Sequence, residues 1–132
     1  MPHLTVEHSA NLGDQTDLDA LCLALHGAML ATGLFELGAI RVRALKADHS
    51  AVADLLPQNA FAHLSLRIGA GRSATEKKAA GDHIFAAATQ ALAPLFQTPH
   101  FALSLEITEI AADLSWKKNA IHSRLRTPKA PQ

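Results

Sequence analysis

The sequence predicts an α/β fold in which two duplicated β-α-β units form one four-stranded sheet with two helices on one face. Four segments alternate apolar and polar residues as strands do, and two longer segments repeat apolar residues at helical spacing. The order strand-helix-strand occurs twice. Because 132 residues suit one domain, we expect a single domain over residues 1–126, with pseudo-repeats at about 2–48 and 60–112.

The first unit begins at the amino terminus. Alternation over residues 2–8 predicts a strand, and apolar residues at helical spacing over 18–29 predict a helix. Thr16 is the expected N-cap, and Gly33 is placed to end the helix. A second alternation over residues 40–44 predicts the strand that completes this unit.

The second unit repeats this order. Residues 61–68 alternate as a strand, and Ser73 and Glu76 then have the spacing of a capping box at a helix start. This helix should kink or end just before Pro94, because proline lacks a backbone donor and clashes with the preceding turn. A fourth strand is expected over residues 101–107.

Two helices on one face leave the other face of the sheet open. In the third strand, Phe61 falls on one face and Leu64 and Leu66 on the other, which indicates that both faces of the sheet bury apolar side chains. We therefore expect oligomerisation to cover the open face. The segment after residue 112 either covers a neighbouring subunit or packs as a short helix on its own chain. Residues 127–132, rich in proline and poor in apolar side chains, are expected to form a mobile tail.

Composition excludes several classes of protein. A hydrophobic share of 48% with 18% charged residues argues against disorder. Twelve basic residues balance twelve acidic ones, which disfavours binding to nucleic acid or to an anionic membrane surface. No apolar run approaches the roughly 20 residues of a membrane span. The single cysteine, Cys22, cannot form an internal disulfide, and we expect a protein of the reducing cytoplasm.

Sites for metals, nucleotides and acyl transfer are not expected. The eight histidines lack the i, i+4 spacing of a helical zinc pair, and no Gly-x-Ser-x-Gly motif occurs. Cys22 falls in an apolar helical stripe, as a core residue would. Gly69, Gly71 and Ala74 match a dinucleotide fingerprint, but Gln90 stands near the position of its acidic residue. We therefore expect no metal and no cofactor.

Pro2 is the first candidate for chemistry. Initiator methionine is generally removed before a small residue such as proline, and removal would leave a secondary amine at the sheet edge. Burial and neighbouring positive charge would favour the neutral amine, which can act as a base near neutral pH. The alternative is that proline simply follows methionine and has no role.

Three arginines are candidates for binding an anion. Arg72 precedes the second helix, where free amides and the helix dipole already favour a carboxylate. Arg41 and Arg43 share one face of the second strand, as a clamp for a dianionic substrate would. Each of the three is equally explained as a solvated surface charge.

Together these residues resemble the 5-carboxymethyl-2-hydroxymuconate isomerases of the tautomerase superfamily, over residues 2–125. The second half is also similar to the minimal 4-oxalocrotonate tautomerase unit. The resemblance rests on residues 1–7 (MPHLTVE), Ser9, Asn11, residues 31–33 (ATG), Arg41, Arg43, residues 69–73 (GAGRS), Lys118, Asn119 and His122.

The resemblance implies a homotrimeric, cofactor-independent enzyme of homoprotocatechuate degradation. It would isomerise the dienol 5-carboxymethyl-2-hydroxymuconate to its oxo-ene form. The proton carrier maps on Pro2 and the two substrate-binding arginines map on Arg41 and Arg72. To these we add Arg43, because a tricarboxylate substrate needs several cationic anchors.

Some positions depart from the pattern. His8 stands where many relatives would carry tyrosine or another residue, and the chain has no tyrosine to act as a general acid. Trp116 stands where a smaller aromatic residue is expected. Two alternatives remain open: another tautomerase-superfamily activity (a phenylpyruvate-type tautomerase, or a hydratase using Glu7 or Glu106), and a noncatalytic trimeric binding protein.

Overall fold

The computed structural model describes residues 1–126, so the tail expected at 127–132 lies outside the described residues. The strands are β1 (His3–Ser9), β2 (Arg41–Ala47), β3 (Ala60–Gly69) and β4 (Phe101–Ile110). The helices are α1 (Leu18–Ala31), α2 (Ala74–Ala91) and α3 (Ala120–Arg126). Short 3-10 turns lie at η1 (Ala10–Asp14), η2 (Leu37–Ala39), η3 (Ala93–Gln97) and η4 (Ala112–Leu114).

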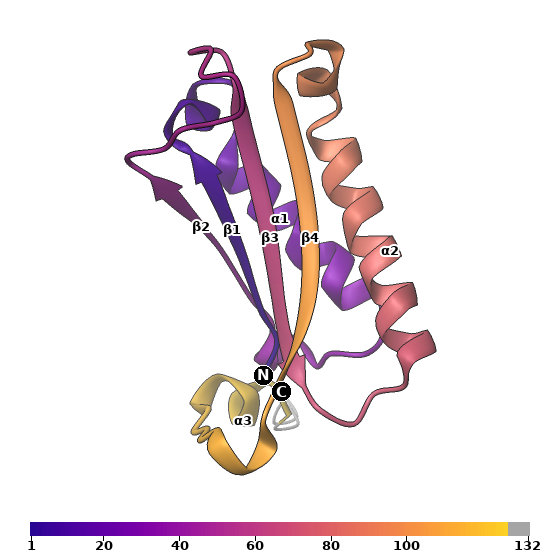
Figure 1. Cartoon of the computed structure of the whole chain (residues 1–132). Coiled ribbons are helices and arrows are strands. Elements are labelled where there is room, and N and C mark those ends of the chain that lie inside the picture. The colour runs from indigo at the N-terminus through magenta and orange to yellow at the C-terminus, as the bar shows by residue number, and fades with distance from the viewer. Residues whose placement is uncertain (127–132) are drawn as a thin grey trace, which may run out of the picture.

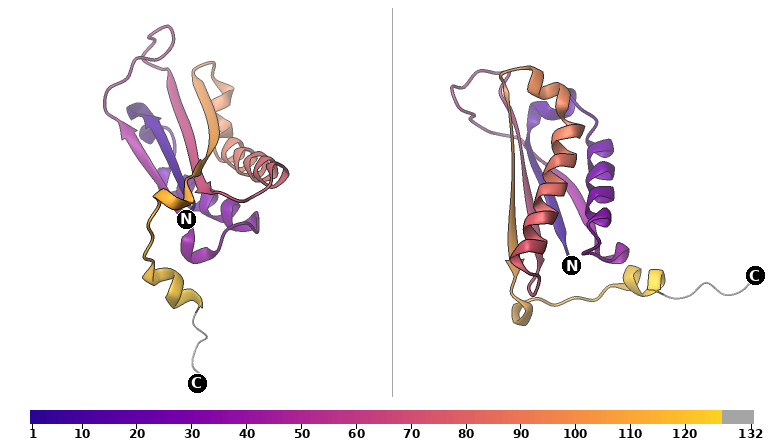
Figure 2. Two further views of the ribbon diagram at one scale, coloured as in Figure 1. Left: turned by 60° about the horizontal axis from the view of Figure 1, so that its bottom comes forward. Right: turned by 90° about the vertical axis from the view of Figure 1, so that its right-hand side faces the viewer.

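The sheet has the strand order β2-β1-β3-β4 (Figure 1). β1 pairs with β2 in parallel, and β3 pairs with β4 in parallel, each pair being joined through a long helix. The two units meet where β1 and β3 pair antiparallel. α1 and α2 cover the same face of the sheet, as the right-hand view of Figure 2 shows. The predicted fold class is confirmed.

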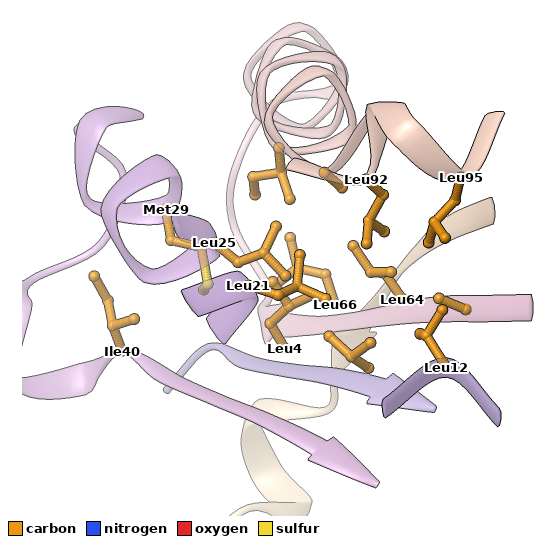
Figure 3. Close-up of a cluster of buried hydrophobic side chains, with 14 of the residues drawn as sticks. Leu4, Leu12, Leu21, Leu25, Met29, Ile40, Leu64, Leu66, Leu92 and Leu95 are labelled. Carbon is orange, nitrogen blue, oxygen red and sulfur yellow. The ribbon is translucent and has the colours of Figure 1, made fainter. Parts of the chain in front are cut away.

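The core lies between this face and the two helices (Figure 3). Leu4 and Leu66 from the sheet and Leu25, Met29 and Ile84 from the helices are completely buried. Each fully buried aliphatic side chain of this size contributes about 1.5–3 kcal/mol. The alternation that predicted the strands is thus the alternation between core and open face.

The open face of the sheet is mainly polar, although the register also places Leu45, Phe61, Ala102 and Ile110 on it. The apolar residues expected on this face are thus present but are a minority. Phe61 begins the outward row of β3, but the positions that follow it on this face are polar. Cross-strand register groups them: His3, Thr5, Glu7, Arg41, Arg43, His63, Ser65, Arg67, Ser104, Glu106 and Thr108. His63 bonds across the strands to Ser104 Oγ (2.6 Å) and Glu106 Oε1 (3.2 Å).

The helix starts follow local cap chemistry. In α2, Ser73 Oγ accepts from the Glu76 amide (3.1 Å) and the Ser73 amide donates to Glu76 Oε1 (2.9 Å), which confirms the capping box. In α1 the N-cap is Asp17, not Thr16, because the Asp17 carboxylate accepts from the Ala20 amide (3.0 Å). No helix within residues 1–126 has the length and apolar character to cross a membrane.

Candidate active site

A cavity of about 310 Å³ opens at the end of the sheet where β1 begins. The loop after α1, the start of α2 and the C-terminal segment meet there, and Figures 1 and 2 show the amino terminus at the same end as this segment. The lining residues are Met1, Pro2, Leu34, Phe35, Glu36, Ala39, Arg72, Lys117, Asn119 and His122.

Pro2 is buried at this cavity, behind Met1. The pKa of the Met1 amino group is lowered, first by burial, then by the neighbouring charge of Lys117 and more weakly by Arg72 and Arg41. Both causes penalise the protonated amine. The surroundings of the chain start therefore favour an uncharged, proton-accepting nitrogen.

Arg72 reaches the cavity from the turn before α2. Its guanidinium donates to the carbonyls of Leu34 (2.9 Å) and Gly69 (3.3 Å) and lies 5.0 Å from the ring centroid of Phe35. These contacts fix the plane of the guanidinium and use only part of its five donors. The remaining donors suit a carboxylate.

The other two arginines occupy different surroundings. Arg41 lies beside the cavity, where its Nη1 donates to the Gly38 carbonyl (3.2 Å). Arg43 lies further along β2, is exposed, and donates to His3 Nδ1 (3.3 Å) on the open face. The structure thus brings Pro2 and Arg72 together, whereas neither Arg41 nor Arg43 is among the lining residues. Arg41 is the nearer of the two, since its charge contributes weakly to lowering the pKa of the Met1 amino group.

The C-terminal segment supplies residues that the sequence did not assign to the site. Asn119 Nδ2 donates to the Gly38 carbonyl (2.9 Å), and Asn119 Oδ1 accepts from the His122 amide (2.9 Å). A Cβ on Gly38 would lie 2.6 Å from His122 Cα, so only glycine permits this approach. The segment packs on its own chain here, which was one of the two expected alternatives. Lys117 belongs to the same lining.

Glu36 is the acidic member of the lining, and basic residues already pair with it. Its carboxylate contacts His122 Nε2 (3.1 Å) and both the Nε (2.6 Å) and the Nη2 of Arg126. The hydrogen bond from Arg126 is the largest cause that lowers the pKa of Glu36. The Glu36 carboxylate is therefore largely neutralised and repels an anionic substrate from the cavity only weakly.

Other candidate groups lie elsewhere. His8 is buried near the far end of β1, and its Nδ1 contacts the Ser9 carbonyl (2.9 Å). Glu7 and Glu106 are on the open face and are not among the lining residues. Within residues 1–126, no three His, Cys, Asp or Glu side chains gather as metal ligands would.

Comparison with known proteins identifies the family. The model of the 5-carboxymethyl-2-hydroxymuconate isomerase family matches residues 2–125. The chain belongs to this family. The 5-carboxymethyl-2-hydroxymuconate Delta-isomerase of Escherichia coli is 37% identical over 123 residues, which are 93% of this chain and 98% of the relative. The family and the isomerase class expected from the sequence are confirmed.

Solved structures agree with this assignment. A 5-carboxymethyl-2-hydroxymuconate isomerase from Deinococcus radiodurans R1 is 43% identical, with a TM-score of 0.88 over 96% of this chain and 95% of that one. A fused 4-OT protein, a symmetric trimer, is 19% identical, with a TM-score of 0.66 over 88% of this chain and 93% of that one. The second likeness concerns the fold alone.

Proposed function

We propose that this member of the family catalyses the ketonisation of 5-carboxymethyl-2-hydroxymuconate in homoprotocatechuate degradation, with Pro2 as the proton carrier. The observation that carries the proposal is the buried Pro2 at a cavity lined by Arg72, in surroundings that lower the pKa of an amino group. The names of the Escherichia coli and Deinococcus radiodurans relatives support the choice of substrate.

The chemistry requires removal of Met1. Pro2 then carries a secondary amine, which accepts the proton of the 2-hydroxyl group. The electron pair of that O–H bond forms the C=O bond, the conjugated double bonds shift, and the amine returns the proton to a carbon of the chain. Arg72 and Arg41 bind carboxylates and stabilise the negative charge that develops on oxygen.

We also propose that the functional unit is a homotrimer. β2 and β4 are both edge strands with unpaired backbone groups, and an edge of this kind is a ready site for another chain. The fused 4-OT protein of similar fold is a symmetric trimer. Threefold closure would pair the edges and turn the polar open faces toward a common axis.

An ultraviolet assay of ketonisation tests the substrate. Purified protein, with removal of Met1 verified by mass, is given 5-carboxymethyl-2-hydroxymuconate, 2-hydroxymuconate or phenylenolpyruvate. We expect the carboxymethyl dienol to have the highest kcat/KM. A higher value for phenylenolpyruvate would make the chain a phenylpyruvate-type tautomerase, and no turnover of any enol would leave a binding protein.

A further inference from the structure

We propose that Lys117 binds the additional carboxylate of the carboxymethyl group and so determines specificity for a tricarboxylate dienol. The inference rests on the proposed function, because it concerns the substrate of the same cavity. It goes beyond the arginines that the family resemblance implies. It also gives the C-terminal segment a role in substrate selection.

Counting charges motivates the search for another cation. The carboxymethyl dienol carries three carboxylates, whereas 2-hydroxymuconate carries two. The proposed function assigns two of them to Arg72 and Arg41, whereas Arg43 already donates to His3. Burying a carboxylate without a partner is costly, so the third one needs a cation at the same cavity.

Lys117 lies where a cation for the third carboxylate is needed. It lines the cavity together with Pro2 and Arg72. Its charge is the largest electrostatic cause that lowers the pKa of the amino group at the chain start, ahead of Arg72 and Arg41. Lys117 therefore lies close to the start of the chain, at the same cavity as Pro2.

The Lys117 side chain is exposed, and its contact with the Met1 amino group ends when Met1 is removed. Within residues 1–126, no salt bridge joins Lys117 to a carboxylate, whereas Glu36 is already engaged by His122 and Arg126. Two positively charged side chains, those of Arg72 and Lys117, thus meet at one cavity. An anion entering between them would relieve their mutual repulsion.

The backbone next to Lys117 is held in place. Asn119, two residues later, is anchored on the Gly38 carbonyl, and its Nδ2 also lies 3.5 Å from Met1 Sδ. The Met1 side chain therefore occupies space between the C-terminal segment and Pro2. Removal of Met1 would open that space to a substituent of the substrate, directly beside Lys117.

The test compares two dienols in four proteins: wild type, Lys117→Met, Lys117→Arg and Lys118→Met. Methionine keeps most of the length of lysine without its charge, and arginine restores the charge. Lys118 is a matched control, because it is the adjacent exposed lysine and is not among the lining residues. kcat/KM for the carboxymethyl dienol and for 2-hydroxymuconate is measured across pH, and the plateaus at high pH are compared, where the amine is neutral in every variant.

We expect Lys117→Met to lower the plateau for the carboxymethyl dienol by about 10-fold or more relative to that for 2-hydroxymuconate. Lys117→Arg should restore most of this preference, and Lys118→Met should leave it unchanged. Equal losses with both dienols, or no loss, would overturn the role of Lys117 while leaving the proposed function intact. If the wild type turns over neither dienol, the proposed function fails and this inference fails with it.

Discussion

The Arg72 guanidinium uses some of its N–H donors to bind backbone carbonyls and leaves the other donors for a substrate in the cavity. Its bonds to the Leu34 and Gly69 carbonyls and its contact with Phe35 set the orientation in advance. We therefore predict that Arg72→Ala lowers kcat/KM for the carboxymethyl dienol about 100-fold, because both carboxylate binding and stabilisation of the developing oxyanion are lost. Steady-state kinetics measures the effect.

Arg43→Ala is the matched control for that substitution. Arg43 lies further along β2, is exposed on the open face and is not among the lining residues. Its removal should change kcat/KM less than threefold, about the effect of a rim charge. An Arg72→Ala enzyme with near-normal kcat/KM, or an equal loss in both variants, would remove Arg72 from the site.

The amine that accepts the proton should titrate below the ordinary value of about 8 for an α-amino group. Burial and the charge of Lys117 lower the pKa of the Met1 amino group. Pro2 is buried at the same cavity, so we expect the same causes to act on its amine once Met1 is removed and to keep the base neutral to lower pH. kcat/KM of the processed enzyme should then fall only as the pH drops through this lowered pKa. A pH profile of kcat/KM measures it, and an acidic limb above 8 would contradict the electrostatic account.

At the scale of residues, the sequence predicts those site residues that a motif in the neighbouring sequence identifies. Pro2 follows methionine, and Arg72 directly precedes a capping box, so both are recognisable along the chain. No local motif places Lys117 and Asn119 at the cavity. Their position depends on the contact between Asn119 and Gly38, which are 81 positions apart in the sequence. Strand periodicity groups Arg43 with Arg41, because it shows which residues share a face of the strand. It does not show which of them lies near the cavity.

The boundaries of helices and strands are likewise predictable where local contacts set them and not where the tertiary structure does. The capping box of α2 was predicted because Ser73 and Glu76 satisfy each other locally. Thr16 and Asp17 are adjacent and both able to cap, and only the geometry of the turn selects Asp17 for α1. The second strand runs over Arg41–Ala47 instead of residues 40–44, since pairing with β1 extends it beyond its apolar alternation.

The link between η2 and α3 depends on a glycine. A Cβ at Gly38 would lie 2.6 Å from His122 Cα, so Gly38→Ala must move backbone. We predict that this substitution displaces α3, increases hydrogen exchange over residues 117–126, and lowers kcat/KM for the carboxymethyl dienol about 10-fold or more through loss of the anchored segment. Exchange mass spectrometry and steady-state kinetics measure the two effects.

Gly27→Ala is the control for a glycine replacement. Gly27 lies inside α1, and no atom lies within 4 Å of an added Cβ. Alanine is favoured over glycine in a helix by about 0.5–1 kcal/mol, so the melting temperature should hold or rise and kinetics should not change. If Gly38→Ala behaves like Gly27→Ala, α3 does not hold the cavity together.

At the scale of the whole molecule, the sequence predicts topology better than surface chemistry. Four alternating segments around two helices define the two β-α-β units, because periodicity reports directly which residues share a face. Phe61 correctly indicates apolar residues on the open face, but the positions that follow it in β3 are polar, and the alternation of one strand does not show this balance for the whole face. The proposed oligomer would use the edges of the sheet together with exposed apolar residues such as Trp116, which is 86% exposed.

We predict a homotrimer in solution. Two open edges on one small sheet invite pairing with further copies, and Trp116 and Leu114 (70% exposed) give the C-terminal segment an apolar surface to bury. Light scattering at micromolar concentration should give three times the 14.0 kDa chain mass. A single-chain mass would contradict the proposed assembly.

The central claim is that a free Pro2 amine moves the proton, and one comparison tests it most directly. Protein with Met1 removed is compared with protein carrying an uncleavable N-terminal extension, each verified by mass and matched in oligomeric state. The extension converts the Pro2 nitrogen into an amide, which cannot accept the proton. We predict at least a roughly 100-fold loss of kcat/KM for the carboxymethyl dienol in the extended protein, within the range contributed by general-base catalysis. Equal rates in the two proteins would contradict the mechanism.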